Sequence, residues 1–204
     1  MLTLFKYQLV VVCGLEKECP KTRLQKLGYP VVTLKGLKSG ILSSFNDNNK
    51  GILFIISGIG HRKALETASY IKHCIKPLFV INIGTAGNPN QTLKIGSWVK
   101  PNKIVDFNNK TFELSDRFPF RLSKTIDLTS SSKLKTVKAP KVYDFEVSDK
   151  SDNYIVDMEA SAFAECFKDS EIFFHTLKYI SDFSDKNLKK DYLVSLTKYQ
   201  SDIV

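Results

Sequence analysis

Four short apolar runs, rich in β-branched residues, limit most strongly what this chain can fold into. The runs are Leu9–Cys13, Gly51–Ile56, Leu78–Ile83 and Phe173–Ile180. Their length and composition are typical of strands that are buried on both faces of a sheet. Apolar residues recur at three- and four-residue spacing over His61–Ile75 and over Met158–Phe167, which predicts a helix in each segment. Strands that alternate with helices in this way predict an α/β fold whose sheet is covered on both sides.

The remaining long segments are less regular. Between Asp106 and Asn153 the chain is polar and shows no clear period, although it contains Phe118-Pro119-Phe120 and the hydroxyl-rich run Thr129–Ser132. We expect loops there, with one or two short strands. The segment from Asp185 to Val204 predicts an amphipathic closing helix, whose apolar positions are Leu188, Tyr192, Leu193 and Leu196. No repeat or linker divides the 204 residues, so residues 1–204 are expected to form one domain.

Composition excludes several classes of protein. No segment approaches the ~20 consecutive apolar residues of a membrane span, and the apolar run that begins at Leu9 is too short for the core of a signal peptide. We therefore expect a cytoplasmic protein without membrane contact. Free thiols and no metal site are predicted, because metal-ligand spacing is missing around the four cysteines, which are Cys13, Cys19, Cys74 and Cys166.

The charge of the chain leaves a nucleic-acid partner open. The formal net charge is +9, from 30 Lys and Arg against 21 Asp and Glu, and clustered cations bind phosphates by releasing counterions. Only four of the cations are arginines, however, and the lysines are spread along the chain among Asn, Ile, Phe and Tyr. We therefore interpret the charge as a solvated surface rather than a binding patch.

Glycine-rich and acidic segments follow the predicted strands at the points where each strand ends. They are Gly14–Glu18 (GLEKE), Ser57–His61 (SGIGH), Gly84–Asn88 (GTAGN) and Ser181-Asp182, together with Asp157–Ala160 (DMEA) at the start of a predicted helix. Each alone is ordinary, since glycines commonly form turns and acidic residues commonly cap helices. Ligands of α/β sheets, however, bind beyond the carboxyl ends of the strands, so these segments together predict one crevice.

In this order and spacing the segments resemble the nucleoside phosphorylase/nucleosidase superfamily, of the purine and uridine phosphorylase type. Within it they are most similar to 5′-methylthioadenosine/S-adenosylhomocysteine nucleosidases. The resemblance rests on GLEKE at 14–18, SGIGHRKA at 57–64, VINIGTAGN at 80–88, LKIGSWVKP at 93–101, VDMEASAFA at 156–164 and YISDFSD at 179–185. It implies a single-domain, three-layer α/β/α sandwich around a mixed twisted sheet. It also implies cleavage of the N-glycosidic bond between a purine and its ribosyl group.

The same resemblance assigns roles to acidic residues. Asp182 matches the aspartate that gives a proton to purine N7, a task that needs a pKa raised by burial, and Ser181 would orient it. An aspartate here, rather than an asparagine, favours 6-aminopurines. Glu159 matches the glutamate that accepts hydrogen bonds from both ribose hydroxyls, where its field stabilises the developing cation, and Met158 matches the methionine packed against the sugar. Glu18 matches the glutamate that activates the attacking water in the nucleosidases.

Two positions depart from the family pattern. Thr85 stands where the nucleosidases usually have a serine, so the hydroxyl remains and a methyl group is added. Lys178 stands where an arginine usually helps to hold the water or an anion, and a lysine lacks the planar fork of arginine. Gly58 and Gly84 are interpreted as positions that allow close approach of the backbone to the ligand.

Other residues near these segments have two interpretations. His61 and Arg62 begin a helix, where they could meet an anion, and we favour an ordinary surface position for both. Nucleosidases of this type usually carry a purine-stacking aromatic residue in the segment that corresponds to Asp106–Asn153, which is shorter in this chain. Four phenylalanines could line the base or the 5′ pocket, although we favour packing in the core for each of them. They are Phe107, Phe118, Phe120 and Phe145.

Hydrolysis is favoured over phosphorolysis by the segment after the first strand. Phosphorylases of this type carry a Gly-Asp-Pro-x-Arg loop there, whose arginine grips phosphate. In this chain Glu16 and Glu18 would repel phosphate but could polarise a water. The resemblance then implies no cofactor, with phosphate as a co-substrate only in a phosphorylase, and methylthioadenosine- or adenosylhomocysteine-type nucleosides as substrates.

Three alternatives remain beside this hydrolase. They are a phosphate-dependent purine nucleoside phosphorylase, a non-catalytic relative that kept the fold, and a basic nucleic-acid binder. The retention of Glu18, Met158, Glu159 and Asp182 together speaks against a decayed site. The partners that we expect are a small purine nucleoside and, because nucleosidases of this type usually pair, a second copy in a homodimer.

Overall fold

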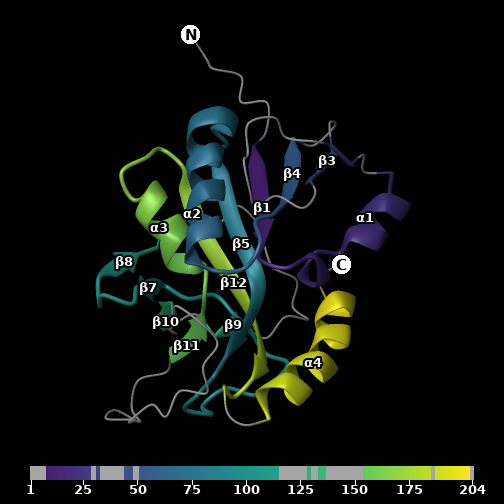
Figure 1. The fold of residues 1–204 in the computed structure, drawn as a ribbon, viewed down its shortest axis with the longest axis vertical. Helices are drawn as coiled ribbons and strands as arrows, with labels where there is room; N and C mark the ends of the chain where they lie inside the picture. The colour runs from purple at the N-terminus through teal and green to yellow at the C-terminus, as the bar shows by residue number, and fades with distance from the viewer. Residues whose placement is uncertain are drawn as a thin grey trace.

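The structure is a computed structural model that describes residues 8–28, 31–32, 44–47, 51–114, 128–129, 133–136, 154–184 and 187–202. Its strands are β1 (Leu9–Cys13), β2 (Val31–Val32), β3 (Ser44–Asp47), β4 (Ile52–Ile56), β5 (Phe79–Gly87), β6 (Trp98–Val99), β7 (Lys103–Val105), β8 (Thr111–Glu113), β9 (Leu128–Thr129), β10 (Lys133–Thr136), β11 (Tyr154–Asp157) and β12 (Phe173–Asp182). Its helices are α1 (Lys21–Lys26), α2 (His61–Tyr70), α3 (Ala160–Phe167) and α4 (Leu188–Asp202), with the short helical turns η1 (Glu16–Glu18) and η2 (Ile71–Ile75). The described strands form one mixed sheet flanked by helices, which confirms the predicted α/β class (Figure 1).

Four parallel strands form the centre of the sheet, in the order β4-β1-β5-β12. All four predicted strands are confirmed, since each apolar run coincides with one of these strands to within one residue at its start. β5 and β12 continue past the runs, to Gly87 and Asp182, so residues predicted to follow the strands belong to the strands themselves. The pairing of β12 with β5 shifts its register between Ile180 and Asp182.

The margins of the sheet are mixed. β3 pairs antiparallel with β4, and β2 with β3, at one edge, while β11, β10, β7 and β8 extend the sheet beyond β5. Our expectation of one or two short strands between Asp106 and Asn153 was too low, because β8, β9 and β10 all lie in the described part of that segment. In β8 only Phe112 is buried, between two exposed neighbours, and so short an alternation leaves no readable period.

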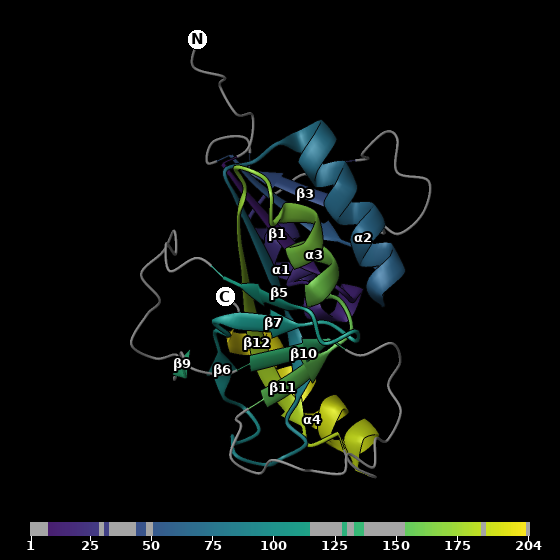
Figure 2. The same cartoon turned by 90° about the vertical axis from the view of Figure 1, so that its left-hand side faces the viewer.

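Alternate residues of β1 face opposite sides of the sheet. Val10 and Val12 belong to the apolar core that α2 and α3 cover, whereas Val11 and Cys13 belong to a second core that includes Leu24 of α1. Successive side chains of a strand point to opposite faces, so both faces of the sheet are covered, as in a three-layer sandwich. Figure 2 shows α2 and α3 together on one of these faces.

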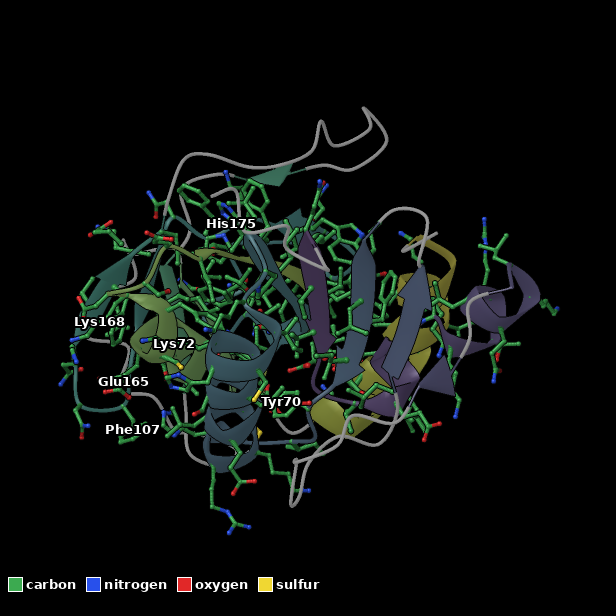
Figure 3. The ribbon with its side chains drawn as sticks, turned by 90° about the horizontal axis from the view of Figure 1, so that it is seen from above. Tyr70, Lys72, Phe107, Glu165, Lys168 and His175 are labelled. Atoms are coloured by element: carbon green, nitrogen blue, oxygen red, sulfur yellow. The ribbon has the colours of Figure 1, made fainter. Side chains whose placement is uncertain are left out.

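The predicted helices are confirmed, with one correction in the last of them. α2 continues into the π-helical turn η2, which carries Lys72 (Figure 3). The Nζ of Lys72 donates a hydrogen bond to the Cys166 carbonyl oxygen of α3 at 2.8 Å. In α4, Leu196 and Tyr199 are buried, but Leu193, which we placed on the apolar face, is 51% exposed. The helix turns about 100° per residue, so Leu193 lies outside the face that 192, 196 and 199 share. No helix among the described residues is long and apolar enough to cross a membrane.

Candidate active site

Neighbouring strands bring the predicted site residues to one edge of the sheet (Figure 1). β1 leads into η1, which carries Glu18, while β5 carries Thr85 and β12 ends at Asp182. β11 pairs with the end of β5 and leads directly into Glu159. The carboxyl ends of the parallel strands are where ligands of such sheets bind, and the candidate residues gather there.

Glu18 is buried and held in one orientation. Its Oε1 accepts hydrogen bonds from the Thr85 N–H at 3.0 Å and from the Thr85 hydroxyl at 2.5 Å, and its Oε2 accepts one from the Leu15 N–H at 3.1 Å. Tyr199, near the end of α4, donates its hydroxyl to the Glu18 carbonyl oxygen at 3.0 Å. A buried carboxylate needs such donors, and here they fix both of its oxygens.

Glu159 precedes α3 and is tied to the start of α2. Its Oε1 accepts a hydrogen bond from the Gly60 N–H at 2.7 Å. The terminal methyl of Met158 lies 4.0 Å from the position that a Cβ would take at Gly60. A Cβ at Gly14 would lie 3.5 Å from Glu18 Oε2 and 3.6 Å from Glu159 Oε2. The two glutamates therefore lie against the same glycine and line one site.

Lys178 is buried in β12, and its ammonium group is paired. Its Nζ lies 2.9 Å from Oδ2 of Asp157, and the two side chains are only 2% and 1% exposed. The same Asp157 oxygen accepts a hydrogen bond from the Ala160 N–H at 3.0 Å, at the start of α3. The cation that we expected to hold the water or an anion is therefore bound to a carboxylate.

The buried charges around Lys178 shift one another's proton affinity. Burial, followed by the charge of Asp157, raises the pKa of Glu159 to about 7, although Lys178 and the Gly60 N–H oppose the shift. Burial disfavours the charged form of Lys178, but Asp157 and Glu159 outweigh it and raise the pKa of that ammonium group. Lys178 consequently stays charged at neutral pH, whereas Glu159 titrates there.

Asp182 is a buried carboxyl group at the end of β12. Its Oδ2 accepts a hydrogen bond from the Ser181 hydroxyl at 2.6 Å and its Oδ1 accepts one from the Ser184 N–H at 2.8 Å. Burial raises the pKa of Asp182, and these two serines oppose the shift. Ser195 of α4 donates to the Ser181 carbonyl oxygen at 2.9 Å, which fastens this end of β12. A carboxyl group whose pKa is raised towards neutrality is suited to donate a proton.

Glycines on β5 make room for these acids. A Cβ at Gly84 would lie 3.2 Å from Glu18 Oε2, and a Cβ at Gly87 would lie 1.9 Å from the Ser184 hydroxyl oxygen. Both glycines thus admit a neighbouring side chain of the protein itself. Gly58 has a φ of +84°, so the turn before α2 requires glycine for its backbone conformation.

A cavity of about 390 Å³ opens beside Gly60 at the start of α2, lined by Ile59, Gly60, His61, Arg62, Lys63 and Phe107. The rings of His61 and Phe107 make a T-shaped contact with centroids 5.3 Å apart. Phe107, labelled in Figure 3, is 38% exposed, so the core packing that we favoured for it is wrong. Arg62 is exposed and His61 half-buried. The other aromatic candidates, Phe118, Phe120 and Phe145, lie outside the described residues.

Sequence reasoning missed two residues that hold the site together. Asp157 pairs with Lys178, and Ser184 donates its N–H to Asp182. Both stand within two residues of a predicted site residue, in the segments DMEA and ISDFSD, and that closeness was the available signal. Within the described ranges no group of three or more side chains could hold a metal ion, and the four cysteines are free thiols.

Comparison with known sequences identifies one similar enzyme. No family model matches the chain. The 5′-methylthioadenosine/S-adenosylhomocysteine nucleosidase of Buchnera aphidicola subsp. Schizaphis graminum is 28% identical over 194 residues, an alignment that covers 80% of this chain and 81% of the relative.

Solved structures share the fold over nearly their whole length. The 5′-methylthioadenosine/S-adenosylhomocysteine nucleosidase of Streptococcus pneumoniae has a TM-score of 0.79 at 12% identity, and covers 96% of this chain and 94% of its own. The Helicobacter pylori enzyme of that name has a TM-score of 0.76 at 17% identity, with coverages of 96% and 93%. The futalosine hydrolase of Helicobacter pylori has a TM-score of 0.74 at 16% identity, with coverages of 98% and 99%. These likenesses confirm the predicted architecture.

Proposed function

We propose that the chain is a nucleosidase of the nucleoside phosphorylase/nucleosidase superfamily, and that it hydrolyses the N-glycosidic bond of purine nucleosides of the methylthioadenosine and adenosylhomocysteine type. One observation carries the proposal. Glu18, Glu159 and Asp182 lie at the carboxyl ends of neighbouring strands, and the carboxyl group of each accepts at least one hydrogen bond from the protein. The 28% identity to a nucleosidase over most of the chain supports it.

In the proposed reaction, Asp182 protonates N7 of the purine, so that the base leaves as a neutral molecule. Its burial and raised pKa suit it to that transfer, and a positioned acid of this kind contributes typically ~10²–10⁴-fold. The bond between the base and the anomeric carbon breaks, and positive charge develops on the ribosyl group. Glu159 accepts hydrogen bonds from the ribose hydroxyls, and its negative charge stabilises the sugar as that charge grows.

The nucleophile that the site favours is water. Glu18, Asp157 and Glu159 all act on Lys178, and Lys178 is already paired with Asp157. Three carboxylates around one paired cation disfavour a phosphate dianion, since like charges repel most strongly where water is excluded. Glu18 accepts one proton of the water as its oxygen attacks the anomeric carbon. The products are free purine and the ribosyl sugar, and the reaction uses no cofactor.

The substrate within this class is proposed from the acid and the relatives together. Asp182 suits a 6-aminopurine, and the sequence relative is named for methylthioadenosine and adenosylhomocysteine. Futalosine is the second candidate, because a futalosine hydrolase shares the fold over nearly its whole length. The four free thiols support a cytoplasmic location for the reaction.

The proposal is tested by measuring release of the free base, with and without phosphate, from methylthioadenosine, adenosylhomocysteine, adenosine, inosine and futalosine. Release of adenine without phosphate is expected, and the best substrate names the activity. Release only in the presence of phosphate would replace hydrolysis by phosphorolysis and remove the role of Glu18. If no substrate releases its base, and the protein retards oligonucleotides in a gel in a salt-dependent way, the basic nucleic-acid binder would be favoured instead.

We also propose that the enzyme is a homodimer, as nucleosidases of this type usually are. The proposal predicts a molar mass in solution of twice the 23.1 kDa of one chain. Light scattering coupled to size-exclusion chromatography measures it directly, and a mass of one chain would contradict it.

A further inference from the structure

One face of α4 lies against the candidate active site. Ser195 donates to the Ser181 carbonyl oxygen at 2.9 Å, next to Asp182, and Tyr199 donates to the Glu18 carbonyl oxygen at 3.0 Å. Tyr192 stands three residues before Ser195 and seven before Tyr199, which places it on the same helical face. It also packs against the apolar cluster that contains Tyr199. α4 therefore directs Tyr192 towards the residues that its two neighbours touch.

The hydroxyl of Tyr192 is buried and has no hydrogen-bond partner among the described residues. Burial, followed by the charges of Glu18, Asp182 and Glu159, raises the pKa of Tyr192, so the phenol keeps its proton. A buried hydroxyl without a partner is unfavourable. A protonated phenol beside three carboxyl groups is a donor that lacks an acceptor, and of the three the charge of Glu18 acts on it most.

Two other donors near Glu18, the hydroxyl of Thr85 and the ammonium group of Lys178, are already engaged with carboxylates. The Thr85 hydroxyl donates to Glu18 at 2.5 Å, and Lys178 Nζ is paired with Asp157 at 2.9 Å. Water needs more than one hydrogen bond to be held in a single orientation, and Glu18 supplies one acceptor for it. The Tyr192 hydroxyl, in contrast, has no hydrogen-bond partner among the described residues.

We propose that the Tyr192 hydroxyl donates a hydrogen bond to the water that Glu18 activates, and so orients the nucleophile. The inference rests on the proposed hydrolysis. The water donates one O–H to Glu18 and accepts the phenol O–H in one lone pair, which leaves its second lone pair for the anomeric carbon. As that carbon is attacked, the water loses its proton to Glu18, while Tyr192 keeps its own. A nucleophile fixed in this way reacts faster without the nucleoside being bound more tightly.

The Tyr192→Phe variant keeps the aromatic ring and removes only the hydroxyl. With methylthioadenosine we expect kcat to fall about tenfold or more, the loss of one hydrogen bond made to the reacting water. KM, the dissociation constant for adenine measured by calorimetry, and the unfolding temperature are expected to stay unchanged. Tyr70→Phe is the matched control, because Tyr70 ends α2, at the opposite end of the helix from Gly60, which bonds Glu159.

Three results would overturn the inference. An unchanged kcat in Tyr192→Phe would show that the hydroxyl does not act on the water. A raised KM with an unchanged kcat would show that it binds the nucleoside instead. A fall in kcat that comes with a lowered unfolding temperature and weaker adenine binding would show a structural role. If the unmodified protein shows no turnover, the proposed hydrolysis itself is overturned. That outcome differs from the three above, in each of which the unmodified protein is active.

Discussion

At the scale of single residues, the buried pair of Lys178 and Asp157 makes a prediction about stability. Removing one partner of a buried ion pair leaves an uncompensated charge in a site that excludes water, which destabilises a protein by ~3–5 kcal/mol. Both side chains are at most 2% exposed. We expect Lys178→Met to lower the free energy of unfolding by that amount in denaturant titrations.

The exposed pair of Lys168 and Asp169 offers a control for Lys178→Met. Its Nζ and Oδ2 atoms are 3.4 Å apart, but the side chains are 45% and 77% exposed. Solvated ion pairs contribute ~0–1 kcal/mol, so Lys168→Met should leave the unfolding transition nearly where it was. Equal effects of the two variants would mean that other groups compensate the charge of Asp157 once Lys178 is replaced.

The proton on Asp182 gives a second prediction at this scale. Asp182→Asn keeps an oxygen that can accept the Ser184 N–H, which is 2.8 Å from Oδ1 in the native protein. Asparagine has no acidic proton for N7, so we expect kcat to fall ~10²–10⁴-fold while the unfolding temperature changes little. Steady-state release of adenine measures the first and calorimetry the second. Near-normal turnover would remove Asp182 from its role as the general acid.

At the scale of elements, α4 acts as the support of η1. The Tyr199 hydroxyl reaches the Glu18 carbonyl oxygen, and its ring packs with Trp98 and Tyr179. We expect Tyr199→Phe to keep this packing but to release η1, lowering kcat and destabilising the fold by about 1 kcal/mol, the net value of one hydrogen bond. Base release and denaturant titration test this. A loss of stability with normal kcat would mean that Thr85 and Leu15 hold Glu18 without help.

Elements also show how far the sequence reaches. The central strands could be predicted, because strands buried on both faces must be continuous apolar runs. β8 and β10 could not, since strands of three or four residues are specified by the neighbours they pair with rather than by their own pattern. The residues of the candidate site were found through short motifs. Their partners were not, because the pairing of Asp157 with Lys178 depends on how β11 and β12 lie in the folded sheet.

At the scale of the whole molecule, the raised pKa of Glu159 links stability to pH. Its folded value of about 7 exceeds the ordinary value of 4.5, so the native state binds more protons than the unfolded state between these limits. Stability that this group contributes is complete below pH 4.5 and is lost as the pH rises through 7. Glu159→Gln cannot ionise, and we therefore expect it to gain stability relative to the native protein as the pH goes from 5 to 8.

Denaturant titrations at several pH values measure this dependence. Glu165→Gln is the control, because the side chain of Glu165 is 44% exposed in its ion pair with Lys110 and solvated charges couple weakly to folding. The difference between Glu159→Gln and the native protein should grow with pH, and that of Glu165→Gln should not. A constant difference for Glu159→Gln would mean that its carboxyl group titrates alike in both states.

The hydrogen bond from Tyr199 to Glu18 also bears on the order in which parts of the protein fold. It joins residues 181 positions apart in the chain, and contacts of such long range form slowly, because the entropy of closing the loop is lost before they form. A ribosome delivers the N-terminal strands first, so β1 and η1 emerge long before the helix that secures them. A nascent chain can therefore form its central strands and still leave Glu18 without the support of Tyr199 until α4 docks.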